Sequence, residues 1–265
     1  MCGLLFLFGA YLIGSVPTGL LIARLMGGPD PRHGGSGNIG ATNVGRLLGK
    51  GAGLLTLGGD ILKGAAPPLA AGWLAAGAPA APAYVMLAGA GAVLGHVYPL
   101  FLGLKGGKGV ATAAGVFLVV SPLALLAAGL VFALLVWRWR YVSLGSIGAA
   151  LSLPAAVWAS GGEPAYVALA VGVGALVITR HRDNISRLRQ GREHRLGASR
   201  TGGIGPLGMI SAIETALGGR TLATPTGPGP SAGAQRSLAL AGPTLVLCLS
   251  PRRQRSRGSR PPVAV

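Results

Sequence analysis

The chain has 265 residues, of which 51% are hydrophobic and only 11% are charged, and its mean hydropathy is +0.59. Soluble globular proteins carry about 25% charged residues, so the composition excludes an ordinary soluble domain and predicts an integral membrane protein. The formal net charge of +17 does not indicate nucleic-acid binding, because the basic residues form short clusters between long apolar runs. Cys2 and Cys248 lie near opposite ends of the chain and define neither a disulfide framework nor a metal site.

Apolar runs follow one another through the first 180 residues. A helix that spans a bilayer needs about 20 mostly apolar residues. The predicted runs are residues 4–26, 51–78, 80–104, 110–137, 142–160 and 164–179. The first run has no basic segment before it and no convincing cleavage site after it, so it is predicted to be a retained helix rather than a signal peptide.

The run at residues 110–137 decides the topology. If it crosses the membrane once, the basic cluster at residues 138–140 lies opposite the one at residues 105–108. Because basic residues concentrate in cytoplasmic loops, we predict instead a hairpin of two short helices that turns at Ser121–Pro122. The predicted fold is therefore an all-α integral membrane protein with about seven transmembrane helices, the N-terminus outside and the C-terminus in the cytoplasm. Five spans with a re-entrant pair is the alternative.

The composition changes beyond Arg195. Residues 1–195 form the predicted membrane-embedded domain. Residues 196–265 are rich in Gly, Pro, Ser, Thr and Arg and are predicted to be a low-complexity, disordered tail. The apolar run at residues 238–249 in this tail is too short to span a bilayer.

A glycine-rich polar segment, residues 35–46, lies between the first two apolar runs. Its glycines free backbone N–H groups to converge on a ligand, and Arg46 supplies a planar cation that suits phosphate. Two further polar clusters, residues 105–109 and 180–193, fall on the same side of the membrane in the seven-span topology. Together the three predict a phosphate-binding site at the membrane surface. Taken singly, each is also explained as a tight turn with basic residues that set topology.

Nucleotide and metal chemistry find little support. Residues 35–40 fit the G-x-G-x-x-G pattern, but no predicted strand precedes them. Residues 105–109 lack the first glycine and the Ser or Thr of a P-loop. The six acids are scattered and the four histidines form no ligand pair at helical spacing, so no metal and no cofactor is predicted.

Few side chains remain for acid–base chemistry. His181 and Asn184 share one face of a helix that begins there, because residues three apart are neighbours on a helix. Asp60 and Lys63 have the same spacing and are predicted to pair, since an unpaired charge near hydrocarbon is costly. His96 ends an apolar run and is predicted to be a hydrogen-bonded packing residue.

Three segments in this order resemble the bacterial acyl-phosphate:glycerol-3-phosphate acyltransferases, the PlsY family. They are residues 35–46, residues 95–112 and residues 180–193. The resemblance covers residues 1–195 and leaves out the tail. It implies a multi-pass enzyme of the bacterial cytoplasmic membrane, without a cofactor, whose active site faces the cytoplasm.

The implied reaction transfers a fatty acyl group from a long-chain acyl phosphate to the 1-hydroxyl of glycerol 3-phosphate. It yields lysophosphatidate and phosphate in the first acylation step of phospholipid synthesis. A functional link to the enzyme that makes acyl phosphate follows. An acyl phosphate is already an activated mixed anhydride, so we predict direct attack. The proton goes either to His181 or to an oxygen of the donor's own phosphate.

The resemblance also implies roles for individual residues, matched motif by motif. The expected catalytic residues are Ser36, Arg46, His181 and Asn184. The expected substrate-binding residues are Gly37, Asn38, Thr42, Asn43, Lys105, Gly106, Gly107, Lys108, Gly109 and Ser143, with the choice between Lys105 and Lys108 as main phosphate ligand left open. Glu193, like the Asp60–Lys63 pair, is expected to be structural.

Two other functions are considered. A non-catalytic membrane transporter or binder of phosphate-bearing lipids would also carry glycine-rich helices and intramembrane charges. It should show inverted repeats with broken helices, and none is evident. An acyltransferase with thioester donors should have a histidine followed four residues later by an aspartate, and no histidine in residues 1–195 has one.

Overall fold

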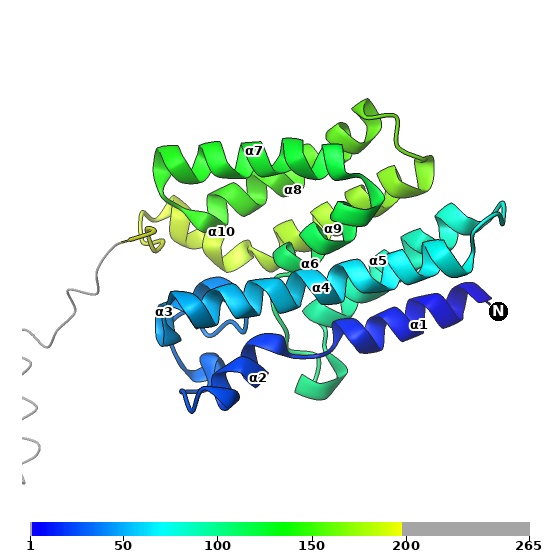
Figure 1. Ribbon diagram of the computed structural model, residues 1–265. Helices are drawn as coiled ribbons and strands as arrows, with labels where there is room; N and C mark the ends of the chain where they lie inside the picture. Colours follow the sequence, from blue (N-terminus) through cyan, green and yellow to red (C-terminus); the bar gives the residue numbers. More distant parts are fainter. Residues whose placement is uncertain (1, 198–265) are drawn as a thin grey trace, which may run out of the picture. The chain divides into compact units, whose positions relative to one another are not determined.

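The computed structural model describes residues 2–197, and within them the chain is helical, with no strand (Figure 1). The α-helices are α1 (Cys2–Gly14), α2 (Thr18–Leu25), α3 (Ala41–Leu48), α4 (Lys50–Leu74), α5 (Ala81–Val97), α6 (Val110–Val120), α7 (Pro122–Trp139), α8 (Val142–Ala159), α9 (Pro164–Arg180) and α10 (Arg182–Arg189). Two short 3-10 helices, Pro31–His33 and Leu100–Leu102, lie in the connections. The all-α prediction is confirmed for this part of the chain. The predicted tail lies outside it, apart from residues 196–197.

Four helical stretches of the described part are long and apolar enough to cross a membrane: Cys2–Leu25, Ala81–Leu102, Pro122–Trp139 and Val142–Ala159. The pair α9 and α10, bent by 56°, makes a fifth if it is counted as one span. The helix α4 has 25 residues but contains Asp60, Lys63 and two prolines, and α6 has only 11 residues. Length and composition therefore support four to five spans.

The predicted break at Ser121–Pro122 is confirmed. Pro122 begins α7, where its missing N–H costs nothing, and a residue before proline is kept out of the helical region. Ser121 has φ −156° and ψ 81°. A chain of side-chain hydrogen bonds joins Lys108, directly before α6, to Ser143, at the start of α8, so the chain reverses its direction between α6 and α7.

A second break divides the first predicted run. The helix α1 ends at Gly14 and α2 begins at Thr18, after Pro17. The carbonyl of Val16 accepts a hydrogen bond of 2.8 Å from Lys63 Nζ of α4. A polar group freed by a proline in an apolar environment needs such a partner, so this break is stabilised by a residue 47 positions away.

Small residues let the helices approach closely. Extensive contacts join α1 to α5, α7 to α8 and α4 to α6. Between α4 and α6, a Cβ on Gly64 would overlap the Thr112 carbonyl oxygen, and one on Gly115 would overlap the Ile61 carbonyl oxygen. Glycine at these positions permits backbone contact, as in many membrane helix pairs.

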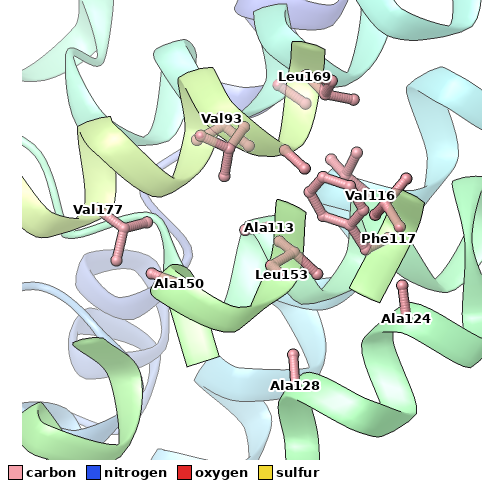
Figure 2. Close-up of a cluster of buried hydrophobic side chains, with 14 of the residues drawn as sticks. Val93, Ala113, Val116, Phe117, Ala124, Ala128, Ala150, Leu153, Leu169 and Val177 are labelled. Carbon is pink, nitrogen blue, oxygen red and sulfur yellow. The ribbon is translucent and has the colours of Figure 1, made fainter. Parts of the chain in front are cut away.

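Buried apolar side chains from α5 to α9 form one cluster (Figure 2). Val93, Val116 and Phe117 are fully or almost fully buried in it. Large apolar side chains on other faces remain outside: Leu62, Leu126 and Leu151 are 69%, 62% and 63% exposed. An exposed apolar surface of this extent fits contact with lipid.

Candidate active site

A cavity of about 400 Å³ lies where the three predicted polar clusters meet. Its polar wall includes Ser36, Asn38, Thr42, Arg46, Lys108, Gly109, His181, Asn184 and Glu193. Its apolar wall comes from α4 and from α6 to α9, through Leu57, Phe117, Leu125, Leu153 and Val173. The prediction that the three clusters converge is therefore confirmed, and the cavity extends from them into the apolar interior.

Asn43 organises the glycine-rich segment. Its side chain is buried, and Oδ1 accepts a hydrogen bond of 2.8 Å from the Ser36 N–H. Nδ2 donates to three carbonyl oxygens, those of Pro31, Gly34 and Asn38, at 2.9–3.0 Å. Asn43 belongs to α3, a short helix that was not anticipated within the polar segment. The predicted substrate ligand is thus engaged in holding the loop.

The side chains around Asn43 face the cavity. Arg46 lies one turn later on α3, and its Nη1 is 3.3 Å from Asn43 Oδ1. Ser36, Thr42 and Arg46 are exposed at the cavity mouth, so they are accessible to a soluble anion. Gly37 is not part of the lining; it has φ +70° and donates to the Gly34 carbonyl in a turn. Its role is to shape the loop.

The second cluster places Lys108, and not Lys105, in the cavity wall. Lys105 is exposed to the outside. The N–H groups of Gly106 and Gly107 donate to the carbonyls of Val97 and His96, at 3.2 and 3.1 Å. These two glycines are therefore bound to the end of α5 and do not offer their N–H groups to a ligand.

Arg180 fixes the same loop from the other side. Its guanidinium donates to the carbonyls of Gly106 and Gly107 at 3.3 and 3.4 Å, and it stacks over the ring of Tyr98. Gly109 has φ +81°, which favours glycine, and lines the cavity at the start of α6. The loop thus has a fixed course that directs Lys108 inward.

Lys108 is half-buried and donates to Asn184 Oδ1 at 2.5 Å. Burial lowers the pKa of the Lys108 ammonium to about 8, and the neighbouring charges of Arg187 and Arg180 act in the same direction. The carboxylates of Glu193 and Asp183 oppose this shift. Lys108 is therefore charged at neutral pH but titrates within an accessible range.

His181 is buried at the junction of α9 and α10, and Nδ1 lies 2.7 Å from the Val177 carbonyl oxygen. A carbonyl only accepts, so Nδ1 carries a proton and Nε2 of the neutral ring is an acceptor. Burial lowers the pKa of His181 to about 4. Asn184 is also buried and lines the same cavity, so the predicted pairing of His181 and Asn184 on one side is confirmed.

Glu193 accepts three side-chain hydrogen bonds: from Asn184 Nδ2 at 2.6 Å, Arg187 Nε at 2.7 Å and Ser143 Oγ at 2.9 Å. Burial opposes ionisation, but these donors hold the pKa of Glu193 below its usual range. Lys108, Asn184, Glu193 and Ser143 thus form a chain of contacts from one cluster to α8. This geometry agrees with the structural role expected for Glu193. The Ser143 hydroxyl, which was expected to bind substrate, donates to Glu193 instead.

The predicted pair of Asp60 and Lys63 is confirmed, with Nζ 3.0 Å from Oδ1. The structure adds that Asp60 and His96 both line the cavity. His96 Nδ1 lies 3.5 Å from Asp60 Oδ1 and has no hydrogen-bond partner among the described residues. The packing role expected for His96 is thus incomplete. In the sequence, the one indication that His96 lies at the site was its position shortly before the loop that carries Lys108.

A helical chain with outward apolar faces, and a cavity that joins cationic and apolar walls, defines a membrane protein suited to phosphate-bearing amphiphiles. The family model described as glycerol-3-phosphate acyltransferase matches residues 4–191. The chain therefore belongs to the glycerol-3-phosphate acyltransferase family, whose members are acyltransferases of the PlsY type.

Individual relatives agree with this assignment. The chain is 55% identical over 192 residues to a glycerol-3-phosphate acyltransferase of Syntrophotalea carbinolica, covering 72% of this chain and 96% of the relative. The corresponding protein of Geobacter sulfurreducens is 52% identical over 189 residues, covering 71% and 95%.

Solved structures of PlsY (YgiH), an integral membrane glycerol 3-phosphate acyltransferase, also resemble the chain. The glycerol 3-phosphate form has a TM-score of 0.69 and 45% identity, covering 74% of this chain and 96% of that one. The lysophosphatidic acid form has a TM-score of 0.67 and 44% identity, with the same coverage.

Proposed function

We propose that the chain transfers an acyl group from a long-chain acyl phosphate to the 1-hydroxyl of glycerol 3-phosphate, with lysophosphatidate and phosphate as products. The observation that carries this proposal is a cavity that joins a cationic mouth to an apolar interior. Both substrates bear a phosphate, and one bears a long apolar chain. The glycerol 3-phosphate and lysophosphatidic acid forms of the related PlsY structure support the acceptor and the product.

The cavity mouth is suited to the phosphate groups. Arg46 of α3 and Lys108 of the loop before α6 bring cations, and Ser36 and Thr42 bring hydroxyls. Cations placed between two phosphates lower their mutual repulsion, which allows both to bind side by side. In this proposal Arg46 and Lys108 hold the acceptor phosphate with Ser36, and Asn184 orients Lys108.

The apolar part is suited to the fatty acyl chain. It begins near Val110 and Ser143 and is bounded by Phe117, Leu125 and Leu153. In this arrangement the acyl chain extends between α6, α7, α8 and α9, and the mixed anhydride stays at the polar end. Both substrates are thereby oriented before reaction, which accounts for a large part of the acceleration expected for an already activated donor.

The chemistry is a direct displacement. The 1-hydroxyl oxygen attacks the acyl carbonyl carbon, the bond from that carbon to the phosphate oxygen breaks, and phosphate leaves with the electron pair. The proton of the hydroxyl passes to His181 Nε2 or to an oxygen of the donor's phosphate. His181 Nδ1 is bound to the Val177 carbonyl, so Nε2 is the nitrogen that can accept a proton.

Two experiments test the reaction. Purified protein receives glycerol 3-phosphate with either palmitoyl phosphate or palmitoyl-CoA, and lysophosphatidate is measured. Product from palmitoyl-CoA alone would refute the proposed donor, and no product from either would favour a non-catalytic binder. Comparing His181→Asn with His181→Ala then assigns the proton: an active Asn variant rules out His181 as a required base.

We also propose seven spans, with the N-terminus outside and the cavity mouth on the cytoplasmic face of the bacterial membrane. The spans are α1 with α2, α4, α5, α6, α7, α8 and α9. The reversal at Ser121 supports this count, and close packing along α4 compensates for the short α6. Basic loops at one end of the bundle support the orientation. An enzyme that makes acyl phosphate would then supply the donor from the cytoplasm.

Labelling of intact cells tests the orientation. In a chain with Cys2→Ser and Cys248→Ser, single cysteines are placed at two exposed positions, Ala78→Cys and Lys105→Cys. A membrane-impermeant maleimide should label position 78 in intact cells and position 105 only after lysis. The reverse pattern would show that the proposed orientation is wrong.

A further inference from the structure

A buried carboxylate lies in the wall of the cavity without a role in the reaction described above. Asp60 is 2% exposed, belongs to α4 and contributes to the lining. A cavity that binds two phosphates gains nothing from a negative charge, because like charges repel at close range. The Asp60 carboxylate must therefore either stabilise the fold or contact a ligand in a way that does not depend on charge attraction.

The protein contacts of Asp60 use one oxygen. Lys63 Nζ lies 3.0 Å from Oδ1, the Thr18 hydroxyl donates to Oδ1, and His96 Nδ1 is 3.5 Å from Oδ1. Among the described residues no hydrogen bond to Oδ2 is found, although a carboxylate can accept on both oxygens. A purely structural carboxylate would be expected to use both. Oδ2 is therefore an acceptor for which the described part of the chain supplies no donor.

The surrounding contacts hold this acceptor in place. Lys63 compensates the negative charge and is itself bound to the Val16 carbonyl at 2.8 Å. His96 is fixed through its own carbonyl, which accepts from the Gly107 N–H of the Lys108 loop. Asp60 is thus connected through His96 to the same loop that carries Lys108, and both residues line the one cavity.

We propose that Asp60 Oδ2 accepts a hydrogen bond from the 2-hydroxyl of bound glycerol 3-phosphate and so determines acceptor specificity. This inference rests on the proposed acyl transfer to glycerol 3-phosphate. The 1-hydroxyl remains free to attack the donor. A carboxylate cannot donate, so it accepts from a hydroxyl and repels a ketone oxygen at the same position. Asp60 therefore selects glycerol 3-phosphate over its keto analogue, dihydroxyacetone phosphate.

The size of the effect follows from the burial of Asp60. A site built to bind a substrate hydroxyl rejects an analogue that lacks it strongly, because the buried polar group is left unpaired. We expect kcat/KM for glycerol 3-phosphate to exceed that for dihydroxyacetone phosphate, or for 3-hydroxypropyl phosphate, by on the order of 10²-fold or more.

The experiment uses the full chain in detergent, with palmitoyl phosphate as donor and these three acceptors. The ratio of kcat/KM values between two acceptors is independent of the fraction of active protein, so partial unfolding does not distort it. Asp60→Asn can turn its amide N–H toward the cavity and donate to a ketone. It should reduce the preference over dihydroxyacetone phosphate by about tenfold or more.

A second variant avoids leaving Lys63 unpaired. The double substitution Asp60→Asn with Lys63→Met removes both charges of the buried pair, which is tolerated better than removing one. It should show the same loss of preference. Glu163→Gln, an acid-to-amide change at an exposed residue outside the cavity lining, should leave the ratio unchanged.

The outcomes are distinct. Wild-type chain that uses 3-hydroxypropyl phosphate as well as glycerol 3-phosphate would overturn the inference without affecting the proposed reaction. Variants with lower kcat for every acceptor at an unchanged ratio would also overturn it, because Asp60 would then be a base or a purely structural residue. If wild-type chain acylates none of the three acceptors, the proposed function fails and this inference with it.

Discussion

We predict that the half-buried ammonium of Lys108 makes binding of glycerol 3-phosphate sensitive to pH above neutrality. The pKa of Lys108 is lowered to about 8, mainly because of burial. A phosphate monoester has its second pKa near 6, so glycerol 3-phosphate is a dianion above about pH 7. A bound dianion favours the ammonium form, so the pKa of Lys108 is higher in the complex than in the free enzyme.

The sign of the effect follows from this linkage. Below about pH 8 Lys108 is charged in both states, and KM for glycerol 3-phosphate should be constant. Above about pH 8 the free enzyme loses a proton that the complex keeps, so KM should rise by up to about tenfold per pH unit. His181, with a pKa of about 4, titrates far below this range and does not contribute.

Substitutions test whether Lys108, rather than another group, causes the rise of KM with pH. Lys108→Met removes a charge-assisted contact of about 1.5–3 kcal/mol, which corresponds to a KM increase of about 10- to 150-fold. Lys105→Met is the matched control, because Lys105 is exposed and outside the cavity wall, and should change KM by less than about threefold. Lys108→Arg keeps its charge at all these pH values and should abolish the rise.

The assay measures initial rates between pH 7 and 9.5 at saturating palmitoyl phosphate, with donor hydrolysis subtracted. A wild-type KM that stays constant to pH 9.5 would refute the reasoning. So would an equal rise in the Lys108→Arg variant, since another group would then be titrating.

Three further substitutions test how the loops are held. Asn43→Ala removes five side-chain hydrogen bonds that hold residues 31–46 together and should lower the free energy of unfolding by about 2–4 kcal/mol, measured by denaturation in detergent; an unchanged value would contradict the role given to Asn43. Gly107→Ala sets a Cβ against the His96 ring and should raise KM for glycerol 3-phosphate, whereas Gly172→Ala, which meets no atom, should not. Glu193→Ala leaves the donor groups of Ser143, Asn184 and Arg187 without their acceptor, whereas Glu193→Gln keeps one amide oxygen. The Ala variant should therefore lose more kcat and thermal stability than the Gln variant, and equal losses would refute the structural role of Glu193.

Local chemistry determined much of this protein from the sequence alone. Hydrophobicity over a helix length predicted an all-α membrane chain, and the basic clusters on both sides of residues 110–137 predicted the break at Ser121–Pro122 between α6 and α7. The three-residue spacing of Asp60 and Lys63 predicted their ion pair. The ion pair depends on neighbours within one turn, and the spans depend on composition along the chain, so both can be read from a sequence.

Only the tertiary structure decided which polar residues face the cavity and which hold the loops in place. Lys105 and Lys108 have equivalent surroundings in sequence, but contacts of the loop with α5 and Arg180 direct only Lys108 into the cavity. Thr42 and Asn43 are adjacent polar residues. The Asn43 side chain donates hydrogen bonds to carbonyl oxygens up to 12 positions away, whereas Thr42 faces the cavity.

Long-range contacts also brought Asp60 and His96, 36 positions apart, into the same wall as the Lys108 loop. The spacing of Asp60 and Lys63 predicted their ion pair, but nothing near Asp60 or His96 in the sequence indicated that the two residues meet each other in the cavity wall. Local sequence specifies which segments are buried and where polar groups occur. Which polar groups remain free for a substrate depends on hydrogen bonds between distant segments, because each bond within the protein removes a group from the site.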